Sequence, residues 1–160
     1  KINMDLTFSV EVIKLKNSLI SDSIRYARRI QESLNPKVSD LQRHLPELFV
    51  LYKPMELVSG DFYWYSCKND VLMLAVVDCT GHGVPGAFMS VLGSNLLNHF
   101  INEVGETDPA EVLRLMDVEA RHILSRHVED EQMFDGMEVG LAAFDMKSQR
   151  LAYAGAGRAL

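Results

Sequence analysis

Apolar residues recur every three or four positions near the start of the chain, which predicts a long amphipathic helix. Residues 6–34 include no glycine and no proline, and the Asn35-Pro36 pair that follows is a typical helix stop. The apolar positions in this stretch also follow a seven-residue repeat, the pattern of a coiled-coil seam. The predicted seam consists of Leu6, Ile13, Ile20, Ile24, Ala27 and Leu34.

Two interpretations of this seam stay open. In the first, the helix packs its apolar stripe on its own domain. In the second, two copies form a parallel coiled-coil homodimer, in which the polar residues Asn17 and Gln31 set the register. A change of register, or of the helix end near Leu34, would then transmit a signal. We therefore expect residues 1–36 to be a helical linker that serves as a dimerisation or switch segment, and residues 37–160 to be a folded domain.

Beyond this linker the pattern changes to alternation and to dense apolar runs, which are typical of strands. Polar turns, glycines and prolines divide the region into separate elements. The expected strands cover residues 48–53, 62–67, 71–77, 137–146 and 151–156, and the expected helices cover residues 85–104 and 109–127. Strands followed by two helices and further strands predict an α+β domain.

Composition narrows the class of protein. The 160 residues are 48% hydrophobic and carry a formal net charge of −6, which is ordinary for a soluble globular domain and unlike a nucleic-acid-binding surface. Cys67 and Cys79 both lie in apolar stretches, so we expect a reduced, cytoplasmic domain. No apolar run approaches the roughly 20 residues that span a bilayer. Because the first residue is Lys1 rather than Met, we expect a longer protein with an upstream sensory region and room for a membrane anchor.

Two aspartates stand out by their positions. Asp78 ends a long apolar run, and Asp61 opens another predicted strand. A carboxylate at the end of a buried strand loses hydration and needs a cation or several hydrogen-bond donors. Residues 79–86 form a glycine-rich loop, which lets backbone carbonyls approach an ion closely. This set suits hard cations such as Mg²⁺ or Mn²⁺, whereas an aspartate before a glycine turn is also a common cap. A metal-dependent hydrolase is therefore one candidate among others.

Five segments of the chain together resemble one known family. The two most specific are residues 58–64 (VSGDFYW) and residues 77–90 (VDCTGHGVPGAFMS). Residues 135–138, residues 153–156 and the linker segment 23–31 add weaker matches. In these motifs the chain resembles the SpoIIE/RsbU-type phosphatases. They belong to the PPM superfamily of metal-dependent protein serine/threonine phosphatases.

The resemblance implies a β-sandwich flanked by helices, with two Mn²⁺ or Mg²⁺ ions as cofactors at one edge. Asp78 would bridge both ions, and the backbone carbonyl of Cys79 would bind one of them. Asp61 would support the site directly or through water, so the two aspartates are the expected catalytic residues. A water activated by the two metals would attack the phosphorus in line, without a covalent enzyme intermediate. Glu138 is the expected third acidic ligand, and Asp135 is the alternative.

Three further expectations depend on this resemblance. Glu138 stands where the family has aspartate, and its side chain reaches one methylene further. The family's last acidic ligand would lie beyond Leu160, so we expect an N-terminal two-thirds of the domain, incomplete at the C-terminus and inactive by itself if that ligand is essential. His82, between Gly81 and Gly83, would either stabilise the loop or act as a general acid for the leaving oxygen.

The leading functional hypothesis is therefore a protein serine/threonine phosphatase. Its expected substrate is a regulatory phosphoprotein, an anti-sigma-factor antagonist-like domain, and this substrate class follows from the resemblance alone. The alternative is a catalytically weak or inactive signalling and dimerisation module of the same fold. A third hypothesis is the hydrolysis of a small phosphoester by the same metal core.

Overall fold

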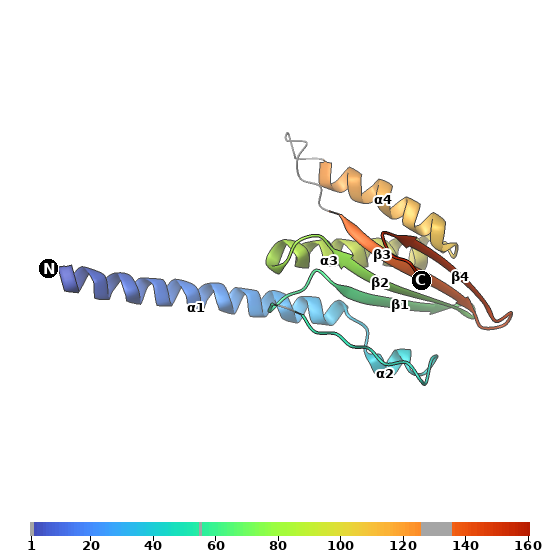
Figure 1. The fold of residues 1–160 in the computed structure, drawn as a ribbon, viewed down its shortest axis with the longest axis horizontal. Coiled ribbons are helices and arrows are strands. Elements are labelled where there is room, and N and C mark those ends of the chain that lie inside the picture. Colours follow the sequence, from blue (N-terminus) through green and yellow to red (C-terminus); the bar gives the residue numbers. More distant parts are fainter. Residues whose placement is uncertain (1, 55, 126–135) are drawn as a thin grey trace.

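Four antiparallel strands form the sheet at the centre of the folded part (Figure 1). The computed structural model describes residues 2–54, 56–125 and 136–160, with side chains from residue 8 onward. The strands β1 (Phe62–Lys68), β2 (Val71–Cys79), β3 (Met137–Asp145) and β4 (Arg150–Ala156) are neighbours in that order. Each strand thus pairs with the next strand along the chain, and the two helices between β2 and β3 do not change this order.

The first hairpin follows from its turn residues. Lys68 pairs with Val71, and the two residues between them, Asn69 and Asp70, have φ angles of 52° and 63°. Two consecutive residues with positive φ form the tight turn whose twist matches that of an antiparallel pair. This turn confirms the predicted hairpin and fixes the register of β1 on β2.

Helices cover one face of the sheet (Figure 1). They are α3 (Gly83–Leu97), its π-helical continuation η1 (Asn98–Val104) and α4 (Pro109–Ser125). Alternate residues of the strands point toward them, because successive side chains of a strand point to opposite faces. The buried core between sheet and helices includes Phe62, Trp64, Met73, Ala75, Val77, Met89, Leu97, Ile101, Val112, Met116 and Leu141.

The helix boundaries agree closely with the sequence pattern. The predicted helix 85–104 begins two residues earlier, at Gly83, and ends before Gly105, whose φ of 87° stops the helix. The second helix begins at Pro109, and the carboxylate of Asp108 accepts a hydrogen bond from the amide of Ala110. The predicted end of that helix at residue 127 lies outside the described residues.

One predicted strand is wrong. Residues 48–53 form no helix or strand and pair with no strand among the described residues. Phe49 and Leu51 are 85% and 77% exposed. Apolar alternation alone does not make a strand, because a strand also needs a neighbour for its backbone hydrogen bonds.

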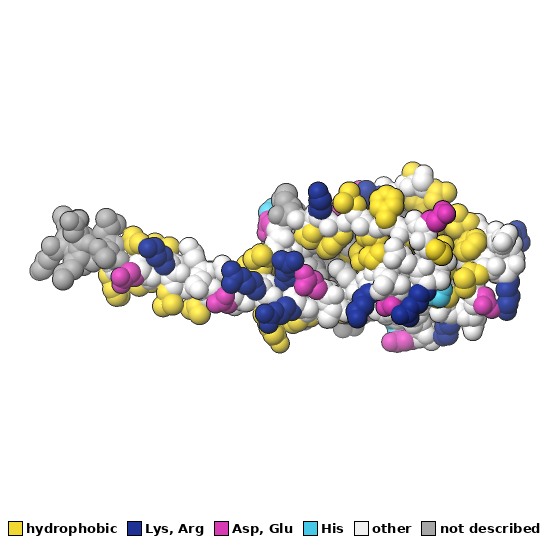
Figure 2. Space-filling view, turned by 90° about the horizontal axis from the view of Figure 1, so that it is seen from below, with side chains coloured by type: hydrophobic (Ala, Val, Ile, Leu, Met, Phe, Trp, Pro, Cys, Tyr) yellow, Lys and Arg dark blue, Asp and Glu magenta, His cyan; other side chains and the backbone are white. Residues whose placement is uncertain are grey.

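The helix predicted over residues 6–34 is present as α1 (Ile2–Leu34), which projects away from the sheet for most of its length (Figure 1). A short helix, α2 (Val38–Leu41), follows it. Figure 2 shows hydrophobic side chains along the projecting part, between basic and acidic ones. Ile13 and Ile20 of the predicted seam are more than half exposed, and the side chain of Leu6 lies outside the described residues.

Gln31 corrects the predicted seam. The dimer interpretation places this residue between two helices, but its side chain is only 7% exposed and is hydrogen-bonded within its own chain. The end of α1 is therefore docked on the domain, whereas its earlier turns are not.

Among the helices of the described residues, none combines the length and the apolar character that a membrane span requires.

Candidate metal centre

Three carboxylates lie at the same level on adjacent strands. Asp78 near the end of β2 pairs directly with Glu138 of β3. Phe62 pairs with Val77, so the same register places Asp61, one residue before β1, opposite Asp78. Directly opposite residues of antiparallel strands point to the same face. The sheet therefore aligns Asp61, Asp78 and Glu138 on the face that the helices leave open.

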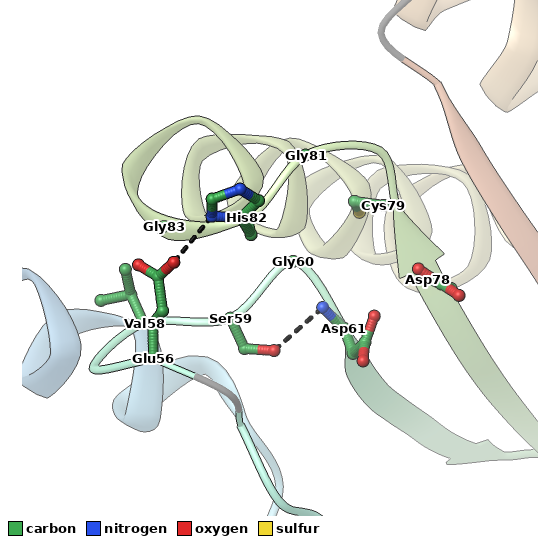
Figure 3. Close-up of a pocket in the computed structure, with 10 residues that line it drawn as sticks. All are labelled: Glu56, Val58, Ser59, Gly60, Asp61, Asp78, Cys79, Gly81, His82 and Gly83. Atoms are coloured by element: carbon green, nitrogen blue, oxygen red, sulfur yellow. Dashed lines mark hydrogen bonds and ion pairs between the residues drawn. The ribbon is translucent and has the colours of Figure 1, made fainter.

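Asp61 and Asp78 lie beside each other at one end of the cleft (Figure 3). Partial burial is the main cause that raises the pKa of Asp61 above 3.8, and the hydrogen bond and negative charge of Asp78 raise it further. Arg158 opposes this shift through its positive charge. Two neighbouring carboxylates with this electrostatic conflict favour the binding of a cation between or beside them.

Arg158 supplies a positive charge to this row. Its guanidinium donates to Asp78 Oδ2 and lies 3.1 Å, measured from Nε, from Glu138 Oε2. This ion pair shows that the space beside Asp78 and Glu138 accepts a positive charge. Nothing in the sequence pattern pointed to Arg158, because only strand pairing brings it near residues so distant in sequence.

The loop after Asp78 brings backbone oxygens to the same place. A Cβ atom on Gly60 would lie 3.0 Å from both the Cys79 and the Gly81 carbonyl oxygen, so only glycine fits without displacement. Gly81 has a φ of 86°, which other residues rarely adopt. The close approach of the two loops thus depends on glycine and leaves carbonyl oxygens beside the carboxylates.

Thr80 ties this loop to the start of β3. Its backbone amide and its hydroxyl group both contact the Gly136 carbonyl, and the Gly136 amide donates to the Thr80 hydroxyl at 2.8 Å. These contacts join the two strands that carry Asp78 and Glu138.

The thiol of Cys79 does not share the role of its backbone carbonyl, which is the expected metal ligand. Burial, with smaller effects of Asp61 and Asp78, raises the pKa of the thiol to about 12. The thiol therefore stays protonated near neutral pH and is a poor nucleophile.

A cleft of about 110 Å³ lies beside the aspartates, lined by both loops (Figure 3). At its other end, His82 Nδ1 lies 2.7 Å from Glu56 Oε1. The side chain of His82 is largely exposed, and that of Glu56 is 43% exposed. The position fits a loop-stabilising pair across the mouth of the cleft, and the sequence analysis missed Glu56, which belongs to no recognised motif.

The backbone of Asp61 is held on both sides. The Ser59 hydroxyl accepts a hydrogen bond from the Asp61 amide at 3.1 Å, and the Tyr52 hydroxyl donates to the Asp61 carbonyl at 3.1 Å. Tyr52 comes from the segment wrongly predicted as a strand. That segment thus contributes to the support of Asp61.

The structure brings together most of the predicted site residues. Asp61, Asp78, the Cys79 carbonyl and Glu138 lie around one end of the sheet, whereas Asp135 is outside the described residues. No three acidic, histidine or cysteine side chains of the described residues are near enough together to surround one ion. The oxygen donors and the cation-accepting space beside Asp78 nevertheless fit a hard divalent cation in chemistry.

Comparison with known proteins identifies the family. The chain belongs to the SpoIIE family, because the family model described as stage II sporulation protein E matches residues 68–159. Among solved structures, the SiaA-PP2C domain of Pseudomonas aeruginosa is similar, with 38% sequence identity and a TM-score of 0.75. The match covers 88% of this chain and 55% of that one, so this chain spans about half the length of the solved structure. No curated protein matches this chain.

These findings confirm the resemblance to SpoIIE-type phosphatases of the PPM superfamily and the α+β, PP2C-like fold. Phosphatases of this superfamily are metal-dependent, which agrees with the oxygen-rich chemistry of the carboxylate row.

Proposed function

We propose that this chain is the N-terminal part of a metal-dependent protein serine/threonine phosphatase domain. The observation that carries the proposal is the row of Asp61, Asp78 and Glu138 across three paired strands, beside a glycine-rich loop. A fold alone does not define an activity. Here the family membership and the arrangement of oxygen donors point to the same chemistry.

Asp78, the middle carboxylate of the row, is the proposed central ligand and would hold two Mn²⁺ or Mg²⁺ ions. Asp61, Glu138 and the Cys79 carbonyl are the proposed further ligands. Bound divalent cations would lower the pKa of water and neutralise charge on the phosphoryl oxygens.

The environment of Cys79 supports a direct attack by water. A covalent route would need an activated nucleophile in the cleft. Cys79 is the cysteine of the cleft, and the raised pKa of its thiol and its burial make it unsuited to that role.

A regulatory phosphoprotein, an anti-sigma-factor antagonist-like domain, is the proposed substrate class. Membership of the SpoIIE family supports it. The second candidate is a catalytically weak signalling module, and the observation that favours it is the contact of Arg158 with both Asp78 and Glu138.

Phosphatase activity of a chain extended past Leu160, measured with and without Mn²⁺ on a phosphoserine protein and on a small aryl phosphate, tests the proposal. Asp78→Asn should abolish activity and weaken Mn²⁺ binding, because the neutral amide is a poor ligand for hard cations. Asp117→Asn, on the exposed surface of α4, is the matched control and should retain both. Mn²⁺ binding without activity on either substrate would favour the signalling module.

The exposed seam of α1 is the proposed homodimer contact, through which an upstream sensory region would act. Ile20 is 58% exposed and Ile24 is partly exposed, so both are accessible to a second copy. Ile20→Asp combined with Ile24→Asp should convert a dimer of the full chain to monomer in light scattering. Ser18→Asp, on the other side of the helix, should not. An unchanged dimer in the double variant would contradict the coiled-coil contact.

A further inference from the structure

Gln31 connects the linker helix to the loop that carries Asp61. Among the described residues, four polar side chains are buried: Gln31, Ser59, Ser90 and Ser94. Gln31 contacts both Ser59 and Ser90 at a single junction between α1, the Asp61 loop and α3. A buried polar cluster of this kind is stable only when its donors and acceptors are paired.

The amide group of Gln31 pairs with both backbone groups of Ser59. Its Oε1 accepts from the Ser59 amide at 3.0 Å, and its Nε2 donates to the Ser59 carbonyl at 2.5 Å. The same Nε2 donates to the Ser90 hydroxyl at 2.7 Å. Both N–H groups of the Gln31 amide are therefore used. The paired bonds to the Ser59 amide and carbonyl resemble those that a neighbouring β-strand would make.

Ser59 transmits this position to Asp61. Its hydroxyl accepts the hydrogen bond from the Asp61 amide, as drawn in Figure 3. Gly60, between them, lies so close to the carbonyl oxygens of Cys79 and Gly81 that a Cβ atom would be 3.0 Å from each and would push against backbone. A shift of Ser59 therefore cannot be absorbed within the loop and would move Asp61 relative to Asp78.

We propose that Gln31 is a positioning residue for the metal centre: it holds Ser59, and through Ser59 it holds Asp61 in the geometry that binds the metal ion. This inference rests on the proposed function, since it assumes that Asp61 and Asp78 bind Mn²⁺. It also assigns a function to the docked end of α1. The metal affinity of the site depends on whether the last turns of the linker helix are in place.

A purely structural role is the competing explanation. In that case Gln31 only docks α1 on the domain, and its loss lowers stability without changing the metal centre of the folded molecules. The two explanations differ in one measurable quantity, the Mn²⁺ affinity of folded protein at a temperature well below its unfolding transition.

The test compares Mn²⁺ dissociation constants by isothermal titration calorimetry in the full chain. Gln31→Leu removes all three hydrogen bonds and should raise the dissociation constant roughly tenfold, because Ser59 loses the partners that fix it. Glu32→Leu is the control on the same helix at an exposed position. Val112→Ala, a core truncation on α4, is the control for lost stability and should leave the dissociation constant unchanged.

Two further variants separate positioning from docking. Ser90→Ala removes the contact with α3 but leaves both bonds to Ser59, so it should change Mn²⁺ affinity much less than Gln31→Leu. When protonated, the carboxyl group of Gln31→Glu offers one donor and one acceptor, which is enough for both bonds to Ser59 but not for the bond to Ser90. The Mn²⁺ affinity of this variant, relative to that of the unaltered protein at the same pH, should therefore be closer to normal at pH 6 than at pH 8.

The outcomes are distinguishable from failure of the proposed function. If the unaltered protein binds no Mn²⁺, or if Asp78→Asn binds it equally well, the metal-centre proposal itself is overturned. If Asp78→Asn loses binding while Gln31→Leu and Val112→Ala have the same affinity as the unaltered protein, only the positioning role is overturned. A tenfold loss confined to Gln31→Leu, with partial recovery in Gln31→Glu at pH 6, supports it.

Discussion

The two faces of the four-stranded sheet differ although the same strands build both. On the face covered by α3, η1 and α4, Val77 and Leu141 are at most 1% exposed. On the other face, Val76 is 61% exposed, and Asp78 lies in the open row with Asp61 and Glu138. One residue along β2 is thus enough to pass from the core to the candidate metal centre.

This difference shows how packing on one face positions chemistry on the other. A slip of β2 by one residue would exchange Val77 and Asp78 between the faces, and burial of the apolar side chains prevents it. The same register aligns Asp78 with Glu138 and with Asp61. The strand register therefore determines both the stability of the fold and the geometry of the candidate metal centre. Single substitutions on the two faces should nevertheless change one of these properties more than the other.

The largest expected effect on stability is that of Leu141→Ala on the covered face. Truncating this fully buried leucine should lower the free energy of unfolding by about 2–5 kcal/mol, because it leaves a cavity in the core. Val76→Ala on the open face should change it by less than about 0.5 kcal/mol. Urea unfolding of the two variants measures the contrast, and similar losses in both would contradict the assignment of the faces.

Gly60→Ala should affect both properties at once. Its Cβ atom would lie 3.0 Å from two backbone carbonyl oxygens, which cannot rotate away as a side chain can. We expect a loss of about 1–3 kcal/mol in unfolding free energy, together with weaker Mn²⁺ binding, because the Asp61 loop must shift. Thermal unfolding and calorimetry measure the two. Gly136→Ala is the control, because there is open space around the added Cβ atom. Gly105→Ala is unsuitable as a control, because Gly105 has a positive φ.

Arg158→Met should change metal binding more than stability. The arginine competes with a bound cation for Asp78 and Glu138, and its pairs with them are partly exposed. Two such pairs are together worth about 1 kcal/mol, so the variant should bind Mn²⁺ roughly fivefold more tightly. Arg150→Met, at the opposite end of β4, serves as the control. Weaker Mn²⁺ binding in Arg158→Met would instead mean that the guanidinium supports the site.

Much of this arrangement was accessible from the sequence. Asp78 was recognisable because it ends an apolar strand before a glycine-rich loop, and the Asn69-Asp70 turn predicted the first hairpin. These signals are local, since each depends on residues that are neighbours in the chain. The family resemblance added Glu138 as an expected ligand and assigned a ligand role to Asp61, which its position at the start of a strand had already singled out.

The missed residues depend on contacts between distant parts of the chain. Arg158 meets Asp78 only because β4 follows β3 in the sheet, and Gln31 is buried only because α1 ends against the Asp61 loop. A heptad pattern could not show this, because it treats Gln31 like Asn17. The segment around Tyr52 was taken as a strand for a similar reason: its pattern does not reveal that it has no strand partner.

The smallest expected effect concerns pH, and it separates the electrostatics of the open face from the packing of the covered face. Burial and Asp78 raise the pKa of Asp61 above its ordinary 3.8, so the folded state holds this proton more tightly than the unfolded state does. In a chelator, the contribution of Asp61 to stability is therefore present at low pH and is lost as the pH rises from 3.8 through the raised pKa. The Asp61→Asn variant has no carboxyl group at this position and therefore does not lose this stability. Its free energy of unfolding, relative to that of the unaltered protein, should increase as the pH rises through that window. Urea unfolding at several pH values measures the trend. Adding Mn²⁺ should reverse it, because the ion binds the ionised carboxylate and stabilises only the protein that retains Asp61. A difference between the two proteins that does not change with pH would mean that neither burial nor Asp78 raises the pKa of Asp61 in the folded chain.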